Sequence, residues 1–412
     1  MAEIIMVGAG IMFAILFAFI LFIFIIFLIS KFKEKQYPEI KPAVSIIIPC
    51  YNEEKNIASC MDSIKNADYP KEKTEIIVVD DGSTDKTWEI LAKYGNIKLF
   101  KQSHKGKSEA LNLGTKIAKH DLILTIDADT IIDKNCIKEI VKPFADKEVA
   151  AASGSCKVSN KNSLIGMFQN VEYHYNNLIR SSFSKVFGNC VWFFGFLACY
   201  RKDVLKQIGL FKKDSMTEDM DISLEIKKAG YRTINAEKAI GCTTAPDTLS
   251  GLYRQRARWW TGGLQALIKN KELFTAKSSP SILFLFINHF WWTLYALISL
   301  PIIIYQVHYW LPNNGSIALF AYLFRWFTLL GPVWVIYKIP VWGISFYSFF
   351  GVLSGIVTAV LTVLAIYMFK DKVKFKNTFA IFFYFPYTIV LNIIVIISLL
   401  KLNFLKKRYF IG

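Results

Sequence analysis

Two carboxylates stand two positions apart in Asp127-Ala128-Asp129, directly after the apolar run Leu122–Ile126. Side chains two positions apart on an extended backbone point to the same face. Carboxylates held in this way suit a hard cation, because Mg²⁺ and Mn²⁺ prefer oxygen ligands and often share them with substrate phosphates. A solvent-facing pair at a strand end is the plain alternative, and the position after a buried run favours the metal site.

A second acidic motif, Asp80-Asp81-Gly82-Ser83, follows the β-rich run 75–79. Its carboxylates can accept hydrogen bonds from the N–H and O–H groups of a nucleotide base and ribose. The alternative is an ordinary turn between a strand and a helix, with Ser83 as the helix cap. Both interpretations stay open for this motif taken alone.

Cations and a glycine open a predicted helix in the segment 104–112, which reads HKGKSEALN. A helix N-terminus that carries a lysine such as Lys107 favours phosphate binding. The alternative is a solvated surface with an excess of lysines.

Thr217-Glu218-Asp219 begins the helical stretch 219–229. A carboxylate at this position is more often a helix cap than a catalyst. An inverting sugar transfer nevertheless needs a general base, which takes the proton from the attacking hydroxyl.

The segment 255–260, QRARWW, combines cations with aromatic rings about twenty residues before a long apolar region begins. Arginine can hold a diphosphate through two hydrogen bonds, and tryptophan offers a flat apolar face to a sugar ring. A basic aromatic helix lying on anionic lipid is the alternative, and one helix could do both.

Strand and helix patterns alternate through the part of the chain that carries these motifs. The runs 44–48, 75–79 and Leu122–Ile126 are typical of buried strands, and the stretches 53–65, 86–94 and 107–119 have helical spacing, with Asn52 as the expected cap of the first. This alternation predicts a parallel sheet covered by helices, with ligands beyond the carboxyl ends of its strands.

The composition excludes a wholly soluble, disordered or collagen-like chain. Of 412 residues 53% are hydrophobic, there are only 22 Gly and 12 Pro, and the mean hydropathy is +0.34. The formal net charge of +17 fits nucleic acid, anionic lipid or phosphate-bearing substrates equally well, although no nucleic-acid-binding module is evident. Seven scattered cysteines without zinc spacing are typical of reduced core residues in a cytosolic domain.

Apolar segments flank the polar part of the chain. Residues 4–30 contain no charged side chain and are followed by Lys31, Lys33 and Lys35, which predicts one span with the following domain in the cytoplasm of a plasma-membrane protein. Four further spans are expected at 282–304, 316–337, 342–369 and 378–400, with basic segments at 370–376 and 401–408. The predicted division is an anchor at 1–37, a catalytic domain at 38–275 and C-terminal helices at 276–412.

Together and in this order the motifs resemble the processive family 2 glycosyltransferases, a group that includes hyaluronan, cellulose, chitin and bacterial poly-N-acetylglucosamine synthases. The resemblance covers roughly residues 40–275, with DDGS at 80–83, GKSEALN at 106–112, DAD at 127–129, TED at 217–219 and QRARW at 255–259. It implies an α/β GT-A (Rossmann-like) cytosolic domain plus α-helical transmembrane segments. The stretch 191–195, VWFFG, departs from the more polar acceptor wall of some members.

The resemblance also implies roles for individual residues. Asp219 would be the catalytic base, and the acceptor would contact Trp259 and Glu218. A donor UDP-sugar, with UDP-N-acetylglucosamine before UDP-glucose, would bind through six side chains: Asp80, Lys107, Asp127, Asp129, Gln255 and Arg258. Asp129 and Asp127 would hold Mg²⁺ or Mn²⁺.

The implied product is a β-linked polysaccharide that passes through the membrane helices, and the implied partners are the acceptor chain, membrane lipid and a small accessory membrane subunit. A transferase that adds one sugar to a lipid, such as a polyprenyl phosphate or ceramide, would use the same motifs. A basic membrane scaffold or channel is the non-enzymatic alternative, although the apolar segments lack an obvious ion relay.

Overall fold

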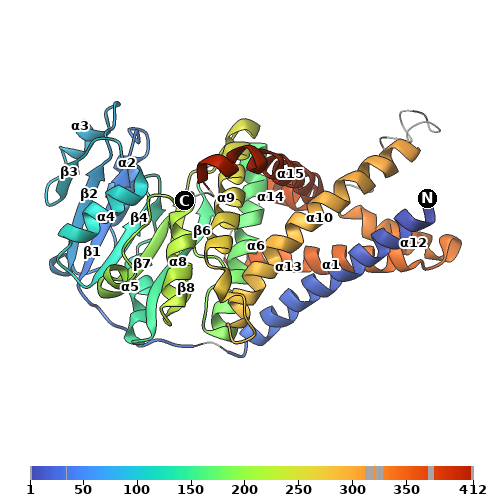
Figure 1. Cartoon of the computed structure of the whole chain (residues 1–412), viewed down its shortest axis with the longest axis horizontal. Helices are drawn as coiled ribbons and strands as arrows, with labels where there is room; N and C mark the ends of the chain where they lie inside the picture. Colours follow the sequence, from blue (N-terminus) through green and yellow to red (C-terminus); the bar gives the residue numbers. More distant parts are fainter. Residues whose placement is uncertain are drawn as a thin grey trace.

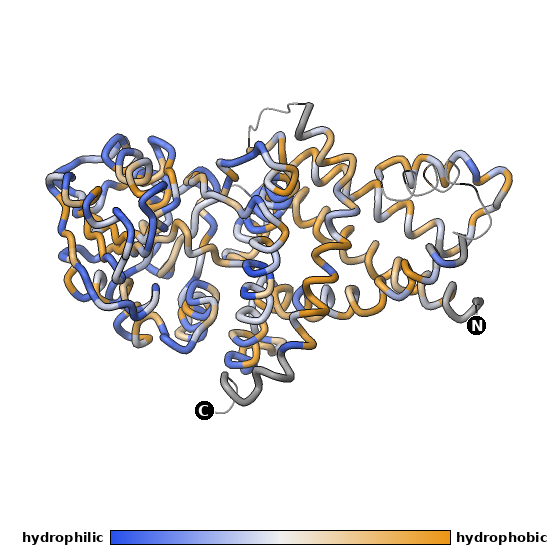
Figure 2. The backbone as a smooth tube through the Cα atoms, turned by 90° about the horizontal axis from the view of Figure 1, so that it is seen from above, coloured by the Kyte–Doolittle hydropathy of each residue, from blue (hydrophilic) through white to orange (hydrophobic). Residues whose placement is uncertain are grey.

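The computed structural model describes residues 2–33, 35–310, 315, 320, 324, 328–369 and 375–409. A domain of strands and short helices forms one end of the molecule, and long helices form the other (Figure 1). Hydropathy changes along the same direction, because the long helices are largely apolar and the α/β domain carries most of the polar surface (Figure 2). Helices α6 (Leu164–Phe187) and α9 (Leu249–Lys269) lie between the two parts.

One sheet of eight strands organises the α/β domain, in the order β3-β2-β1-β4-β7-β6-β8-β5. The bounds of the first half are β1 (Val44–Cys50), β2 (Thr74–Asp80), β3 (Lys98–Lys101) and β4 (Leu122–Ile126), and those of the second half are β5 (Ile131–Ile132), β6 (Val149–Val158), β7 (Leu197–Arg201) and β8 (Arg232–Thr243). The three strands predicted from sequence are confirmed as β1, β2 and β4. Every residue of β1 and β4 is buried, as expected for strands covered on both faces.

The predicted parallel sheet is confirmed for β1 to β4, whereas the second half of the sheet is mixed. β1 to β4 run parallel, but β7 pairs antiparallel with both β4 and β6, and β5 pairs antiparallel with β8. The antiparallel register sets Leu197, the first residue of β7, opposite Ile126, the last residue of β4. The loop that enters β7 therefore lies beside the end of β4, where an all-parallel sheet would place only strand ends.

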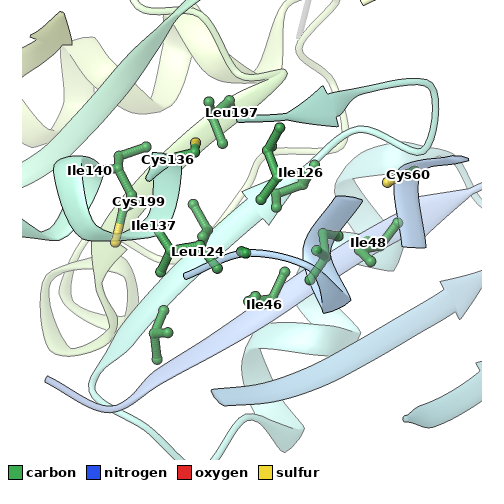
Figure 3. Close-up of a cluster of buried hydrophobic side chains, with 14 of the residues drawn as sticks. Ile46, Ile48, Cys60, Leu124, Ile126, Cys136, Ile137, Ile140, Leu197 and Cys199 are labelled. Carbon is green, nitrogen blue, oxygen red and sulfur yellow. The ribbon is translucent and has the colours of Figure 1, made fainter. Parts of the chain in front are cut away.

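The core of the first half-sheet lies between β1, β4 and the helices on one face. Ile46, Ile48, Leu124 and Ile126 interdigitate there with residues of α5 (Cys136–Val141) and β7 (Figure 3). All seven cysteines are free, and six of them are buried, in agreement with the predicted reduced core residues.

Four of the expected helices are present with shifted ends: α2 (Ile57–Lys65), α3 (Thr87–Leu91), α4 (Lys107–Ile117) and α8 (Glu218–Lys228). The expected cap of the first, Asn52, is wrong, because α2 begins four residues later than the pattern suggested. Asn52 has φ +54°, and its side-chain carbonyl accepts the Thr84 N–H at 2.8 Å, so it joins two loops instead of starting a helix. The remaining short elements are α7 (Lys202–Gln207), η1 (Lys71–Lys73), η2 (Lys142–Ala145) and η3 (Lys271–Leu273).

Four described helices contain segments long and apolar enough to cross a membrane: Val7–Ser30, Pro280–Tyr305, Ser348–Met368 and Tyr384–Lys401. They belong to α1 (Ala2–Ser30), α10 (Pro280–Trp310), α13 (Phe346–Met368) and α15 (Tyr384–Tyr409). Part of the expected span 316–337 and most of the basic segment 370–376 lie outside the described residues.

The expected limits of the last spans are corrected by two breaks. Helix α12 (Leu330–Trp342) ends at Gly343, whose φ of +70° leaves the helical region, and Ser345 caps α13 anew, so that the span expected at 342–369 starts later. The span expected at 378–400 is interrupted at Phe383, between α14 (Phe375–Phe382) and α15. α12 contains an apolar stretch of only Leu330–Val341 and is too short to count as a span.

Candidate functional site

A cavity of about 810 Å³ opens at the carboxyl end of β4 and continues between the apolar helices. Eight of the nine residues expected at the site line it: Lys107, Asp127, Asp129, Glu218, Asp219, Gln255, Arg258 and Trp259. Residues of α1, α10, α13 and α15 line its far part, among them Phe19, His289, Thr358 and Asn392. The cavity therefore joins the acidic edge of the sheet to the apolar helix bundle.

Lys107 is the central cation of the acidic edge. Its Nζ lies 2.7 Å from Asp127 Oδ1 and 2.9 Å from Glu218 Oε1, so the start of α4 bridges the end of β4 and the start of α8. Burial raises the pKa of Asp127 to about 6, against the opposing attraction of Lys107. Burial alone would also raise the pKa of Glu218, but Lys107 outweighs it and the pKa is lowered.

Asp129 has a different environment from Asp127. Its Oδ2 accepts the Thr243 hydroxyl at 3.0 Å, and its Oδ1 accepts the Thr130 hydroxyl at 3.3 Å. Both partners are neutral hydroxyls, which orient the carboxylate without neutralising it. Thr243 ends β8, and nothing in the sequence pattern marked it as part of the site.

The donor set fits a divalent cation that shares its ligands with a substrate. Asp127 and Asp129 supply carboxylate oxygens, and Mg²⁺ is commonly held by one or two carboxylates together with phosphates and water. Within the described ranges there is no cluster of three or more His, Cys, Asp or Glu side chains that could hold a metal. The two carboxylates thus suit an ion that arrives with a diphosphate better than a permanently bound one.

Asp219 is held by backbone donors at the first turn of α8. Its Oδ2 accepts the Gly195 N–H at 2.8 Å and its Oδ1 accepts the Met220 N–H at 2.8 Å. Burial, and next the charge of Glu218, raise the pKa of Asp219. A carboxylate with a raised pKa is a stronger base, as proton abstraction from a sugar hydroxyl requires.

Gly195 was missed in the sequence, although the structure leaves no space for a larger residue at this position. An added Cβ would lie 2.5 Å from the Asp219 Cβ. Gly195 lies in the loop that enters β7, whose antiparallel pairing with β4 brings it to the site. The sequence carried no signal for this contact, because the pairing joins segments about seventy residues apart.

Helix α9 presents the aromatic side of the site. The Trp259 ring, 36% exposed, lies under the Arg256 guanidinium at 4.4 Å. Arg256 is buried and pairs with Glu172 Oε2 at 2.9 Å, and Glu172 Oε2 also accepts the Tyr387 hydroxyl of α15 at 2.6 Å. Arg256 and Glu172 were not among the expected site residues, although Arg256 stands within the QRARW motif.

Other polar side chains of α9 have few hydrogen-bond partners among the described residues. Arg258 is exposed, and its only hydrogen bond to a described residue is a long one, 3.5 Å, to the Met216 carbonyl. Gln255 Oε1 and Trp260 Nε1 are buried, with no hydrogen-bond partner in the described part of the chain. The Trp260 ring stacks on His289 of α10 at 4.1 Å. Gln255 Oε1 and Trp260 Nε1 can therefore bind a polar ligand in the cavity, which both residues line.

Asp80 does not line the cavity. Its side chain has no exposed surface; Oδ1 accepts the Ser83 N–H at 2.9 Å, and Oδ2 lies 3.9 Å from Lys101 Nζ without a hydrogen bond among the described residues. Contact with a nucleotide would require neighbouring side chains such as Lys101 to move.

Asp81, the second carboxylate of the motif, stabilises the loop before α4 by accepting hydrogen bonds from it. It accepts the backbone N–H groups of Lys105 at 2.9 Å and Gly106 at 2.8 Å, and the Gln102 side chain at 2.6 Å. These bonds fix the loop that leads into α4 and thereby the position of Lys107.

Comparisons with known proteins agree with this geometry. Residues 45–209 match the family described as Glycosyl transferase family 2. The chain is 30% identical over 233 residues to the poly-beta-1,6-N-acetyl-D-glucosamine synthase of Staphylococcus epidermidis, and 32% identical over 233 residues to that of Staphylococcus aureus strain COL. Each match covers 55% of this chain and 56% of the relative, so the chain spans about half the length of these curated relatives.

A solved structure shares the fold. The mannosyltransferase from Pyrobaculum calidifontis, in complex with GDP-Man and Mn²⁺, has a TM-score of 0.60 at 23% identity, covering 87% of this chain and 99% of that chain. The predicted GT-A fold with apolar helices is confirmed, as is the predicted resemblance to family 2 glycosyltransferases of the poly-N-acetylglucosamine synthase type.

Proposed function

We propose that this chain is a membrane-bound inverting glycosyltransferase that adds N-acetylglucosamine from UDP-N-acetylglucosamine to a growing β-linked polysaccharide. One observation carries the proposal: a single cavity joins the paired carboxylates, the base candidate and the tryptophan platform to the apolar helices. A polymerase needs such a continuous space, because the product must leave the reacting centre without losing contact. The similarity to two poly-beta-1,6-N-acetyl-D-glucosamine synthases supports the choice of sugar.

The donor would bind at the carboxyl end of β4. Asp127 and Asp129 would hold Mg²⁺ or Mn²⁺, and this ion would supply positive charge to the leaving diphosphate. Lys107 and Arg258 would add their own charges, and among the described residues Arg258 has one weak hydrogen bond to lose when it turns to a phosphate. Gln255, whose Oε1 has no hydrogen-bond partner in the described part of the chain, would accept a hydrogen bond from a hydroxyl or amide of the donor sugar. Asp80 would bind the uridine once Lys101 moves aside.

The acceptor sugar would stack on Trp259, and Glu218 would help to position it through its contact with Lys107. Asp219 would take the proton of the attacking hydroxyl while the new glycosidic bond forms on the face opposite the diphosphate. The Gly195 and Met220 N–H groups hold both of its oxygens, so the carboxylate keeps one orientation during the transfer. A direct displacement of this kind inverts the anomeric configuration.

We also propose the arrangement in the membrane. Lys31 and Lys33 follow the apolar helix α1, and positive residues gather on the cytoplasmic side of bacterial spans. The proposed units are an anchor at 1–37, a cytoplasmic catalytic domain at 38–275 and C-terminal helices at 276–412 in a plasma membrane. The growing chain would pass between the helices that line the cavity, and a small accessory membrane subunit would bind the same bundle.

The proposal is tested by incubating the detergent-solubilised full chain with a panel of UDP-sugars plus Mg²⁺ or Mn²⁺, and by measuring UDP release and product size. The expected result is turnover of UDP-N-acetylglucosamine, dependence on the added ion, and a polymer. A lipid that carries one sugar would instead establish the single-addition transferase. Absence of UDP release with every donor would contradict the proposed enzyme class.

A further inference from the structure

A buried arginine lies behind the stretch 191–195, which we call the acceptor wall. Arg180 of α6 has no exposed surface, and its hydrogen bonds to described residues all go to neutral groups, so it forms no ion pair among them. Buried cations are ordinarily paired with carboxylates, since an unpaired charge is costly to remove from water. The donors of Arg180 go instead to neutral groups around the loop that enters β7.

This guanidinium donates hydrogen bonds to strand β6 and to the loop that enters β7. Its Nε donates to the Trp192 carbonyl of the loop at 2.9 Å, and in β6 its Nη1 donates to the Gly154 carbonyl at 3.0 Å and its Nη2 to the Ser153 hydroxyl at 2.6 Å. Its Cζ lies 3.8 Å from the centre of the ring of Phe194, a residue that lines the cavity. One side chain therefore joins strand β6 to the aromatic acceptor wall.

Ser153 continues this set of contacts to the next residues of the loop. We call the hydrogen bonds that join Arg180, Ser153 and the segment 192–195 the clamp. Its hydroxyl donates to the Phe194 carbonyl at 2.8 Å and accepts the Phe194 N–H at 3.1 Å. The following residue, Gly195, donates its N–H to Asp219 Oδ2 at 2.8 Å. Each of these hydrogen bonds has an ordinary length, so the path from Arg180 to the base candidate is continuous.

We propose that Arg180 is a positioning residue for the transfer reaction, which acts through Ser153 and the segment 192–195 to hold Asp219 and the Phe194 wall in their reactive arrangement. The proposal rests on the proposed function in one respect, the role of Asp219 as the base. It assigns to Arg180 no contact with the sugar or the diphosphate. It also gives a role to a buried arginine that has no carboxylate partner among the described residues.

Only a guanidinium can make these contacts together. It offers five N–H donors in a planar fork and a face for an aromatic ring, whereas a lysine offers one rotatable ammonium. Arg180→Lys therefore keeps the charge but loses at least two of the three hydrogen bonds to Trp192, Gly154 and Ser153. Ser153→Ala removes the hydroxyl link alone and leaves the guanidinium in place.

Arg201 supplies a matched control. It makes the same kind of clamp elsewhere in the domain, with donors to the Val149 carbonyl at 2.8 Å and the Phe144 carbonyl at 2.8 Å, and with the Phe144 ring 5.5 Å away. None of these groups lines the cavity. Arg201→Lys disturbs a half-buried guanidinium with the same kinds of partners and does not touch the stretch 191–195.

The first readout is turnover. For Arg180→Lys we expect kcat to fall about 30-fold and for Ser153→Ala about 10-fold, since small misplacements of reacting groups are costly. UDP affinity should stay within about twofold in both, and Arg201→Lys should keep its kcat. Rates equal to wild type in Arg180→Lys, or a matched loss in Arg201→Lys, would overturn the proposal.

The second readout is the pH profile of kcat. The charged groups that face Asp219 are Glu218, Lys107 and Arg180. Weakening of the Gly195 N–H bond raises the pKa of Asp219, so the acidic limb should move to higher pH by about one unit in Arg180→Lys. A purely structural defect would lower kcat without moving this limb.

The third readout does not need activity. Amide hydrogen exchange of the segment 192–196 should be slow in the wild type, faster by at least about tenfold in Arg180→Lys, and unchanged in Arg201→Lys. Unchanged exchange in Arg180→Lys would overturn the clamp. A wild type that shows protection but no sugar transfer would instead count against the proposed function and leave the clamp standing.

Discussion

The nucleotide side and the acceptor side of the site differ in how their polar atoms are satisfied. On the nucleotide side the loops after β1 and β2 bind one another, as when Asn52 accepts the Thr84 N–H at 2.8 Å. Asp81 binds the loop before α4 through three donors, including the Gly106 N–H at 2.8 Å. The loops on this side are therefore largely formed before any ligand binds.

The acceptor side keeps two buried polar atoms free. Trp260 Nε1 and Thr217 Oγ1 have no hydrogen-bond partner among the described residues. Buried polar groups are usually satisfied, so such atoms indicate where a ligand or water supplies the missing partner. Donor binding therefore depends on loops that the protein itself fixes, whereas acceptor binding depends on groups whose hydrogen bonds the sugar chain completes. Changes on the acceptor side should then spare donor binding.

Asp219→Asn should have the largest effect and separates the two sides most clearly. We expect turnover to fall about 1000-fold, because the amide cannot accept the proton, while UDP affinity changes by less than about twofold. UDP release and equilibrium binding of UDP with Mn²⁺ measure the two quantities. Asp133→Asn, an exposed aspartate of the same domain, is the control and should behave as wild type. Polymerisation at the normal rate in Asp219→Asn would exclude the base role.

Asp129→Asn should act on the nucleotide side. Loss of a carboxylate ligand is expected to weaken ion-dependent UDP binding about 100-fold, with a smaller effect on binding without the ion. Titration with Mn²⁺ in the presence and absence of UDP measures this difference. Thr243→Val, which removes only the hydroxyl bound to Asp129 Oδ2, should lose less affinity. Ion-dependent binding that survives in Asp129→Asn would contradict the proposed metal site.

Trp259→Ala should lower acceptor use about 10-fold, because an aromatic platform for the sugar is lost. Hydrolysis of the donor without acceptor should change little. Trp259→Phe keeps a ring under Arg256 and should recover most of the polymer yield. An equal loss of polymer formation and donor hydrolysis in Trp259→Ala would mean that the site as a whole is disturbed.

Tyr387→Phe should have the smallest effect and tests how far the acceptor side depends on the helix bundle. The change removes the 2.6 Å hydrogen bond to Glu172 but leaves the Glu172–Arg256 pair in place. We expect the KM for acceptor to rise about threefold with the KM for donor unchanged. A larger rise in the donor KM would show that the two sides are not separable.

The strands and the motif residues were readable from the sequence because each depends on local pattern. The runs that became β1, β2 and β4 are apolar and rich in branched residues, and eight of the nine nominated residues line one cavity. Asp127 and Lys107 could be nominated because their residue types and neighbours already suit a diphosphate.

The site residues that the sequence did not reveal are placed by pairing between strands that lie far apart in the chain. Gly195 and Thr243 reach the site because β7 runs antiparallel to β4 and β8 ends beside Asp129, and neither arrangement has a local signal. The expected start of α2 failed for a related reason, since Asn52 takes a positive φ to bind the neighbouring loop. A residue whose side chain binds a distant segment, and not its own helix, cannot be recognised from the local sequence pattern.

The most direct test is a structure of the full chain with UDP, Mn²⁺ and a short β-linked N-acetylglucosamine oligomer. We expect the diphosphate at Asp127 and Asp129, the terminal sugar on Trp259 with a hydroxyl within hydrogen-bond distance of Asp219, and the rest of the oligomer between the apolar helices. An oligomer bound outside this cavity, or a terminal hydroxyl directed away from Asp219, would contradict the proposed function.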